Sequence, residues 1–502
     1  MKRPRPTAGL DSAERGGGVT CSGPSRRQVL KAGIVAAGIA AAGSLGAIHF
    51  ADPSPVRRPN LLLLVTDDQR ADSLSCAGNP VLKTPNIDAL AQRGIRFVNS
   101  FATTAICMSS RASILTGLYT RLHKISDFTT PLAPELFASS YPKLLRDAGY
   151  RTGFVGKWGI DGGELPNSSY DYFAGYQGQG NYFSPGSNKH LTVLETEQAI
   201  EFLNGCKQSQ PFCLAVSFKA PHVQDEGRFV DGIYPKYPYD RALDHLYEND
   251  KIPPVKTVDA APLPGFLETS LNRTREAVDF SAPTYQETMK DLYRLIAGVD
   301  QAAGKIVAEL KRLGFDDNTV IVYTADHGSF YGEHGFGGKW LMLEEAIRTP
   351  MIICDPRAPA SRQGKLCEQM VLNIDVPATL LDLAGITPPV GMQGKSLLPL
   401  AMGETPSWRK EWFYENHFRN QRAGPIAASE GIRTTDWKYI RYIDTDPIYE
   451  QLFDLKADPR EEKNLAANPA HADRLTAMRS RWETWNKSLD GFSVKDRWSD
   501  PA

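Results

Sequence analysis

Several segments of the chain are continuous apolar runs rather than alternations of apolar and polar residues. A strand buried on both faces of a parallel sheet has this pattern. The runs predict strands at 60–66, 212–218, 319–325 and 350–354, with further strand-like segments at 95–101 and 151–155. Helical spacing predicts helices at 86–93, 141–148, 195–203 and 284–313. Strands that alternate with helices predict an α/β fold with a large, mostly parallel central sheet flanked by helices.

The pattern changes from about residue 388, where apolar runs become short and alternate with polar residues. Strands with one face in solvent have this alternation. It predicts a hairpin at 431–442 with its turn near Asp436, a strand at 451–455 and a helix at 470–485. We therefore expect a larger domain, residues 52–387, and a smaller C-terminal α+β subdomain with an antiparallel sheet, residues 388–502.

Two internal segments lack periodicity. Residues 164–189 are rich in aromatic residues, Gly and Asn, and predict a long loop. Residues 225–280 are a Pro- and Tyr-rich insertion. The aromatic side chains from Tyr170 to Tyr182 either line a ligand cleft or pack inside the protein.

The first 51 residues predict a targeting segment. Paired arginines within residues 25–31 precede an Ala/Gly-rich apolar run at 32–48, which is typical of a twin-arginine (Tat) export signal. A membrane anchor is the alternative, although the run is short and Gly-rich for a membrane span. We expect cleavage between residues 44 and 52, the Tat machinery as a partner, and a periplasmic or secreted bacterial protein without a stable membrane span.

Composition and charge narrow the function classes. The 502 residues carry 57 Lys and Arg against 58 Asp and Glu, so no basic face for nucleic acid is indicated. Of the seven cysteines, Cys21 leaves with the export signal. The close pairs Cys206/Cys213 and Cys354/Cys367 could be disulfides in an oxidising compartment or free thiols. Spacing alone does not decide between these alternatives.

The segment 107–117 places a cysteine before small hydroxyl residues, an arginine and an apolar run. We expect a helix here, with Ser109 and Ser110 as caps and Gly117 as its C-terminal stop. A thiol at a helix N-terminus near Arg111 lies in positive potential, which favours anions. The alternative is an inert, buried cysteine, which is the commoner situation for a free thiol.

Polar side chains lie at the ends of three predicted strands and in two predicted loops. Carboxylate and imidazole groups come at the strand ends: Asp67 and Asp68, His222, and Asp326 and His327. Two Gly-flanked loops bring Lys157 and Lys339. Because ligands bind at the carboxyl ends of strands in open α/β sheets, we expect these groups to meet near Cys107. Carboxylate oxygens suit Ca²⁺ or Mg²⁺, and the surplus cations suit a tetrahedral oxyanion such as sulfate or phosphate.

These motifs, in this order, resemble the type I sulfatases of the alkaline phosphatase superfamily over essentially the whole chain after the export signal. Cys107-Met108-Ser109-Ser110-Arg111 followed by Leu115-Thr116-Gly117 resembles the family pattern Cys-x-Pro-Ser-Arg followed by Leu-Thr-Gly. Other blocks that match are Thr66–Arg70, Gly156-Lys157-Trp158, Ala220-Pro221-His222, Asp326-His327-Gly328, Gly332–Gly335, Gly338-Lys339, Gly394–Leu398 and Leu452–Leu465.

The resemblance implies that a formylglycine-generating enzyme oxidises Cys107 to formylglycine (3-oxoalanine), whose hydrate attacks the sulfur of a sulfated small molecule or glycan. It implies a Ca²⁺ ion held by Asp67, Asp68, Asp326, His327 and the group derived from Cys107. It also implies that three cations, Arg111, Lys157 and Lys339, neutralise the transferred group. His222, together with Lys339, would protonate the leaving oxygen.

Three positions depart from the family pattern. Ser109 stands where Pro is usual, within the recognition motif of the converting enzyme. Gly159 stands where many members have a His that assists release of the sulfate. His327 replaces the commoner Asn, which leaves Mg²⁺ and Mn²⁺ open beside Ca²⁺. Two alternatives therefore stay open: a phosphate or phosphonate ester hydrolase of the same superfamily, and a non-catalytic binding protein with unconverted Cys107.

Overall fold

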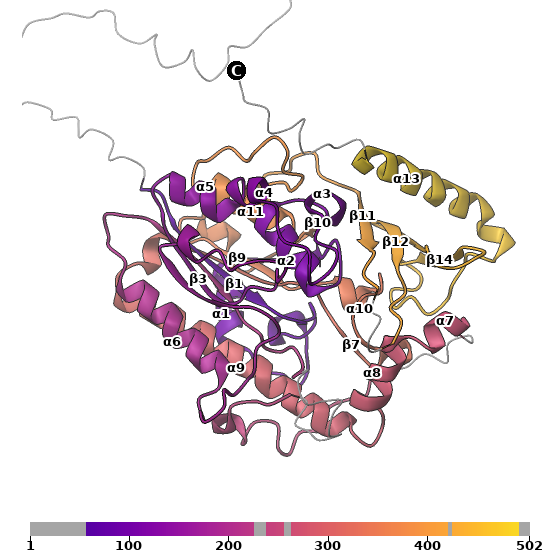
Figure 1. The fold of residues 1–502 in the computed structure, drawn as a ribbon, viewed down its shortest axis with the longest axis horizontal. Coiled ribbons are helices and arrows are strands. Elements are labelled where there is room, and N and C mark those ends of the chain that lie inside the picture. Colours follow the sequence, from indigo (N-terminus) through magenta and orange to yellow (C-terminus); the bar gives the residue numbers. More distant parts are fainter. Residues whose placement is uncertain (1–56, 225–236, 256–262, 420–423, 491–502) are drawn as a thin grey trace, which may run out of the picture. The chain divides into compact units, whose positions relative to one another are not determined.

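The central sheet has eight strands in the order β10-β2-β9-β6-β1-β5-β3-β4 (Figure 1). The computed structural model describes residues 57–224, 237–255, 263–419 and 424–490. Every neighbouring pair is parallel except those of β9, which runs antiparallel to β6 and β2. The strands are β1 Asn60–Thr66, β2 Ile95–Phe101, β3 Arg151–Lys157, β4 Tyr172–Tyr176, β5 Phe212–Ser217, β6 Thr319–Ala325, β9 Met351–Cys354 and β10 Lys365–Leu372. The predicted fold class is confirmed.

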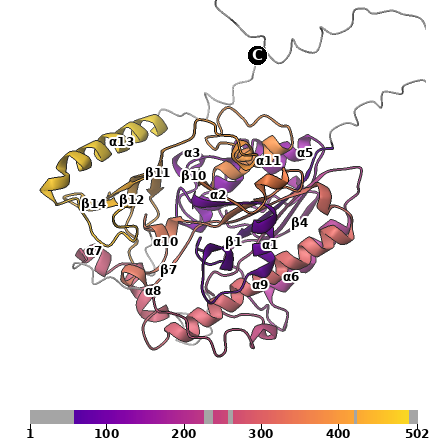
Figure 2. The same ribbon diagram turned by 180° about the vertical axis from the view of Figure 1, so that it is seen from behind.

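Helices cover both faces of this sheet (Figures 1 and 2). Alternate residues of β1 face opposite layers: Leu62 and Leu64 pack with α1, α6 and α9, whereas Leu61 and Leu63 pack with α2, α5 and α11. Both faces are therefore apolar, which explains the continuous apolar runs. The helices of these layers are α1 Pro85–Arg93, α2 Cys107–Thr116, α5 Tyr141–Asp147, α6 Leu191–Asn204, α9 Tyr285–Arg312 and α11 Asp375–Leu383. Shorter helices are α3 Thr120–His123, α4 Pro134–Ala138, α7 Gly265–Glu268, α8 Leu271–Asp279, α10 Glu344–Ile347 and α12 Leu398–Ala401.

A second sheet of four antiparallel strands, in the order β11-β12-β13-β14, follows in the C-terminal part. Its strands are β11 Glu411–Asn416, β12 Ser429–Thr434, β13 Trp437–Tyr442 and β14 Tyr449–Asp454. The hairpin predicted around Asp436 is β12–β13. Helix α13, Ala472–Asp490, contacts β12 and β13 (Figure 1). A two-stranded ribbon, β7 Phe330–Tyr331 with β8 Gly337–Gly338, lies between β6 and β9 in sequence.

The segment predicted as a long loop, 164–189, contains a strand. β4, Tyr172–Tyr176, pairs in parallel with β3 and forms an edge of the central sheet. The loop prediction was wrong here because β4 is a short, half-buried edge strand within a segment rich in Gly and Asn. The aromatic residues that bound this segment are packing groups: Tyr170 is buried against Phe154 and Phe173, and Tyr182 stacks on His190.

Other differences concern strand ends, the insertion and the cysteines. β3 extends to Lys157, so this lysine ends a strand rather than lying in a loop. In the described part of the insertion 225–280, residues 263–280 contain helices α7 and α8, and residues 237–255 contain a 3-10 turn at Arg241–Leu243. The four cysteines whose pairing the sequence left open, Cys206, Cys213, Cys354 and Cys367, are free thiols. The predicted export signal lies outside the described residues. Within the described residues, every helix is too short or too polar to cross a membrane.

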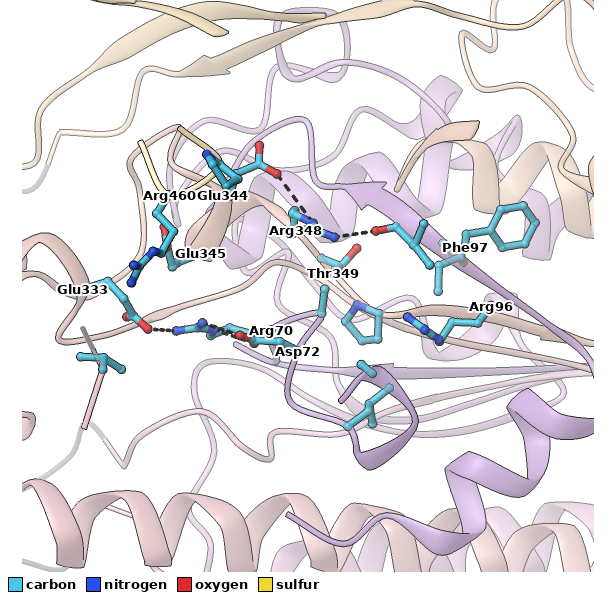
Figure 3. A pocket seen from close by; sticks show the side chains of 18 residues that line it. Arg70, Asp72, Arg96, Phe97, Glu333, Glu344, Glu345, Arg348, Thr349 and Arg460 are labelled. Carbon is cyan, nitrogen blue, oxygen red and sulfur yellow. Dashed lines mark hydrogen bonds and ion pairs between the residues drawn. The ribbon is translucent and has the colours of Figure 1, made fainter. Parts of the chain in front are cut away.

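A cavity of about 500 Å³ lies beside β2, β9 and α10 (Figure 3). Charged side chains line it, and most are paired with one another. Arg70 bonds Asp72 and Glu333, and Arg348 lies 3.6 Å from Glu344. None of the site residues predicted from the sequence lines this cavity, so it is separate from the cluster described next.

Candidate active site

Helix α2 presents Cys107 as its first residue. Ile106, in extended conformation, precedes the helix, and Gly117 ends it in the left-handed region with a φ of 73°. The predicted stop is confirmed, but the predicted caps are wrong. Ser109 and Ser110 lie inside the helix, where their hydroxyl groups donate to the carbonyl oxygens of Ile125 and Asp326. The second bond joins α2 to the end of β6.

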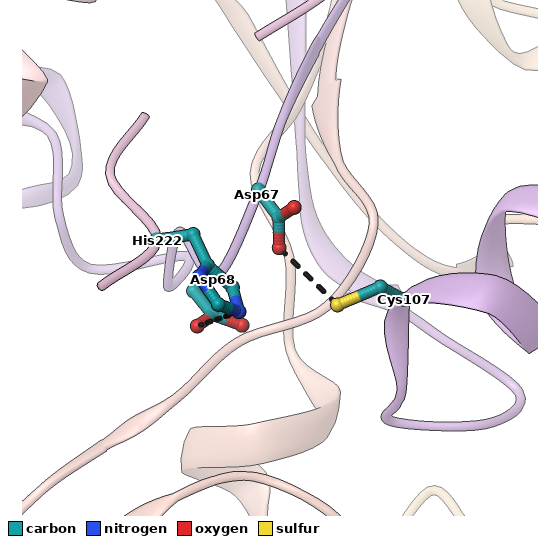
Figure 4. Close-up of side chains that lie close together, drawn as sticks. All are labelled: Asp67, Asp68, Cys107 and His222. Carbon is teal, nitrogen blue, oxygen red and sulfur yellow. Dashed lines mark hydrogen bonds and ion pairs between the residues drawn. The ribbon is translucent and has the colours of Figure 1, made fainter. Parts of the chain in front are cut away.

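The ends of β1, β5 and β6 bring the predicted acidic and imidazole groups together. Figure 4 shows Asp67, Asp68 and His222 near Cys107. The strands are in register there, with Val65 opposite Ser217 and Thr66 opposite Ala325. The ligand atoms fall into two overlapping groups, and within each group they lie within 4.8 Å of one another. The groups are Asp67, Asp68, Cys107 and His222, and Asp67, Cys107, Asp326 and His327.

Arg111 and Lys157 approach these carboxylates from the side of β3. Arg111 Nε donates to Asp326 Oδ2 at 3.0 Å, and its Nη2 donates to Asp67 Oδ2 at 3.1 Å. Lys157 Nζ also donates to Asp67 Oδ2. All these side chains are almost fully buried. Asp67 Oδ1 stays directed at Cys107 Sγ, 3.4 Å away.

Lys339 lies against both Cys107 and Asp68. Its Nζ is 3.0 Å from Cys107 Sγ and 2.7 Å from Asp68 Oδ1. Its loop is held by the C-terminal sheet, because Tyr414 Oη and Asn416 Nδ2 of β11 both donate to the carbonyl oxygen of Trp340, at 2.7 and 2.9 Å. The C-terminal sheet therefore positions one of the cations of the site.

The two histidines have defined orientations. His222 Nδ1 is 2.7 Å from the carbonyl oxygen of Val223, and His327 Nδ1 is 3.0 Å from that of Gly328. Because a carbonyl only accepts, both Nδ1 atoms carry the hydrogen. His327 Nδ1 also lies 3.2 Å from Asp68 Oδ1, so both nitrogen atoms of this ring face the cluster. His222 Nε2 lies 3.6 Å from Asp68 Oδ2, and His327 Nε2 lies 3.4 Å from Cys107 Sγ.

The crowding of charges shifts the pKa values in opposite directions. Burial by itself would raise the pKa of Asp67, but the cations around it, Lys157 foremost, hold that pKa well below its usual value. Burial raises the pKa of Asp68, and the neighbouring Asp67 and Asp326 carboxylates add to this. The pKa of Lys339 is well above its usual value, because Asp68 and Cys107 outweigh the effect of burial. Asp67 is therefore a carboxylate, whereas Asp68 is destabilised as an anion.

The donor set fits a divalent cation. The two overlapping groups share Asp67 and Cys107; one adds Asp68 and His222, and the other adds Asp326 and His327. Hard oxygen donors such as these carboxylates are the ligands that Ca²⁺ and Mg²⁺ prefer. Burial raises the pKa of Asp68, and the Asp67 and Asp326 carboxylates add to this; a bound cation would favour the ionised form. The same groups therefore can hold a metal next to Cys107, with three side-chain cations left for an anionic ligand.

Three uncharged side chains at or next to the site were not predicted from the sequence. Ser217, at the end of β5, accepts from Arg111 and donates to the carbonyl oxygen of Lys157 at 2.7 Å. Gln179, on the turn after β4, accepts from Lys157 Nζ at 2.6 Å. Asn373 donates to Ser110 Oγ at 2.8 Å. Strand-end position marks Ser217 in the sequence, but nothing local distinguishes Gln179 or Asn373 from ordinary loop amides.

Family models match most of the chain. The model described as "Sulfatase" matches residues 59–386, and the model described as "N-sulphoglucosamine sulphohydrolase, C-terminal" matches residues 332–488. The first match contains all the site residues predicted from the sequence.

Individual proteins are similar over most of their length. The N-acetylglucosamine-6-O-sulfatase of Bacteroides thetaiotaomicron is 30% identical, over 89% of this chain and 89% of its own. The multifunctional alkaline phosphatase superfamily protein PehA of Trinickia caryophylli is 29% identical, over 86% and 96%. A solved structure of a protein in complex with its substrate D-glucosamine-2-N,6-O-disulfate matches with a TM-score of 0.68 and 28% identity, over 86% of this chain and 98% of that chain.

Proposed function

Because the chain belongs to the sulfatase family, within the alkaline phosphatase-like superfamily, and is thus a sulfuric ester hydrolase, we propose that it removes sulfate from a carbohydrate at the Cys107 site. The observation that carries the site assignment is the meeting of Arg111, Lys157 and Lys339 with the carboxylates beside Cys107. The similar proteins named for glucosamine sulfates support a sulfated sugar as the substrate.

In this proposal the cations bind the sulfate group. Lys339 is the cation nearest to Cys107 Sγ, so it would lie against the reacting sulfate oxygens. Arg111 and Lys157 both donate to Asp67 Oδ2, so they would balance the charge of this carboxylate and also attract the sulfate group. His222 keeps its Nδ1 hydrogen on the carbonyl of Val223, so its Nε2 can deliver a proton to the leaving oxygen of the sugar.

Two further groups complete the proposed site. Formylglycine derived from Cys107 would supply an oxygen nucleophile in place of a thiol. A divalent ion, Ca²⁺ or alternatively Mg²⁺ or Mn²⁺, would be held by Asp67, Asp68, Asp326, His327 and the converted Cys107, and would stabilise negative charge on sulfate. Mass spectrometry of the Cys107 peptide from the native host tests the conversion, because the aldehyde and the thiol differ in mass. An intact thiol would favour the non-catalytic alternative.

The reaction class is tested with paired aryl esters. We expect purified, converted enzyme to hydrolyse 4-nitrophenyl sulfate with a higher kcat/KM than 4-nitrophenyl phosphate or phenylphosphonate esters. The similarity to PehA makes this comparison necessary. A preference for the phosphorus esters would replace the sulfatase assignment with the phosphonate or phosphate hydrolase alternative. A panel of sulfated monosaccharides and glycosaminoglycan fragments then identifies the sugar.

We also propose the cell location and domain division given by the sequence. Residues 1–51 would direct Tat export, and the formylglycine-generating enzyme would act on Cys107 during maturation. The larger domain would span 52–387 and the C-terminal subdomain 388–502. The four-stranded antiparallel sheet, which lies wholly after residue 388, supports this division.

A further inference from the structure

Beside the cations of the site lies a surface made of amide side chains. It consists of Gln179 and Asn181, on the turn after β4, and Gln224, two residues after His222. Gln179 Oε1 accepts from Lys157 Nζ at 2.6 Å. Tyr182 joins the turn to the other side of the site, because its hydroxyl donates to the carbonyl oxygen of His222 at 2.6 Å. The amide surface therefore spans the space between Lys157 and His222.

The hydrogen bonds fix which way each amide points. An ammonium only donates, so Gln179 must turn its carbonyl oxygen to Lys157 and its NH₂ group away. The backbone N–H of Tyr182 donates to Gln224 Oε1 at 3.2 Å, so Gln224 must donate its own Nε2 to Asn181 Oδ1. Two NH₂ groups, of Gln179 and Asn181, are left without an acceptor among the residues that the structure describes.

The turn is built to hold these groups in place and open to solvent. Gly178 and Gly180 both have positive φ, 70° and 64°, on either side of Gln179. The backbone N–H of Gly178 donates to Asp161 Oδ1 at 3.0 Å. A Cβ atom on Gly178 would meet nothing within 4 Å, so this side of the turn borders open space. Gln179 is half-buried and Asn181 is exposed, so both side chains can be reached from solvent.

We propose that Gln179 and Asn181 are specificity-determining residues that donate their amide NH₂ groups to the uncharged oxygen atoms of a pyranose ring whose sulfate lies at Cys107. This inference rests on the proposed function and adds to it the residues that would recognise the sugar. Side chains 177–181 carry no charge, so they suit hydroxyl or acetamido oxygens rather than a second anion. The neighbouring Tyr182 is buried and stacks on His190, so its ring does not offer a stacking surface to an aryl group.

The experiment compares two sulfate esters, N-acetylglucosamine 6-sulfate and 4-nitrophenyl sulfate, on converted enzyme. Asn181 does not contact Lys157, so Asn181→Ala should act on the sugar alone, whereas Gln179→Glu keeps an acceptor for Lys157 and removes the donor. We expect each variant to lower the ratio of the two kcat/KM values, sugar over aryl, by about tenfold, the effect of one hydrogen bond, mainly through KM. Asn204→Ala, on the exposed end of α6, is the control and should leave the ratio unchanged.

The outcomes separate this inference from the proposed function. Wild-type enzyme that hydrolyses neither ester contradicts the sulfatase site itself. Wild-type enzyme that hydrolyses the aryl ester but not the sugar ester overturns the amide surface alone. Variants that lower kcat/KM for both esters equally overturn it too, because a merely structural role would not change the ratio.

Discussion

The side chain of Arg111 occupies the space beside Gly159. A Cβ atom on Gly159 would lie 2.4 Å from Arg111 Cδ, and Gly159 itself has a φ of 74°. Arg111 is fixed at its far end by Asp67 and Asp326, so its aliphatic part cannot move aside without breaking those bonds. Gly159, which departs from the family pattern, thus leaves the room that the side chain of Arg111 occupies.

We predict that Gly159→Ala displaces Arg111 and lowers kcat/KM for a sulfate ester by about a hundredfold, the cost of a small misplacement of a binding group. The positive φ adds about 1–2 kcal/mol of lost stability. Steady-state kinetics and thermal unfolding measure the two effects separately.

Gly385→Ala is the matched control, because Gly385 has a φ of 73° and a Cβ there would meet nothing within 4 Å. It should lower stability by a similar amount and leave kcat/KM unchanged. If both variants keep full activity, the contact between Arg111 and Gly159 does not position the arginine.

The apolar runs predicted the sheet well, because strands buried on both faces need no partner information to be recognised. The same reasoning predicted that Asp67, Asp326 and His222 lie at the carboxyl ends of neighbouring strands, where the structure has them. The two edge strands were not predicted, because β4 is half-buried and β10 carries exposed residues along half its length.

Contacts between distant segments explain the remaining errors. The hydroxyl of Ser110 was expected to cap its own helix, but it bonds the end of β6, which is 216 residues away in sequence. Gln179 matters only because β4 brings it to Lys157. Local propensity predicts a local hydrogen bond, and tertiary structure offers these side chains a different one.

Removal of the metal should abolish hydrolysis and lower stability. The three clustered carboxylates repel one another without a cation, and ion binding at 100 times the Kd adds about 2.7 kcal/mol to the free energy of unfolding. We expect chelated enzyme to lose activity and to regain both activity and melting temperature on addition of Ca²⁺, Mg²⁺ or Mn²⁺, and the rank order identifies the ion.

Asp326→Asn should remove the thermal response to metal, whereas Asp317→Asn, an exposed carboxylate before β6, should keep it. A chelated enzyme with full activity and an unchanged melting temperature would exclude a metal at this cluster.

Glu195 makes stability depend on pH. It is fully buried on α6, its Oε1 accepts from Tyr176 Oη at 3.2 Å, and burial raises its pKa from 4.5 to about 8. Between these values the unfolded chain releases the proton and the native protein keeps it, so this contribution to stability is lost as pH rises from about 4.5 to 8. The loss is about 5 kcal/mol at most.

Glu195→Gln should therefore raise the melting temperature relative to wild type, and by more at pH 8 than at pH 5. Glu197→Gln, on the exposed face of the same helix, should show no such trend. A difference between Glu195→Gln and wild type that stays constant with pH would mean that the native carboxyl ionises normally.

A buried lysine links the C-terminal sheet to helix α10. Lys438 of β13 is fully buried, and its Nζ lies 2.9 Å from Glu344 of α10 and 2.5 Å from Glu461. Glu461 also accepts from the backbone N–H of Glu344 at 2.7 Å. Glu344 keeps Arg433 Nε at 3.3 Å, so loss of the ammonium removes the cation of Glu461 above all, which costs about 3–5 kcal/mol.

Lys438→Met should lower the free energy of unfolding in urea by that amount, whereas Lys456→Met, an exposed lysine just after β14, should change it little. Adding Glu461→Gln to Lys438→Met should recover part of the loss, because one uncompensated charge is removed.

Because β11 of the same sheet holds the Lys339 loop through Tyr414 and Asn416, Lys438→Met should also lower kcat/KM at temperatures where it is still folded. Full activity in a destabilised Lys438→Met enzyme would show that the position of Lys339 does not depend on this ion cluster.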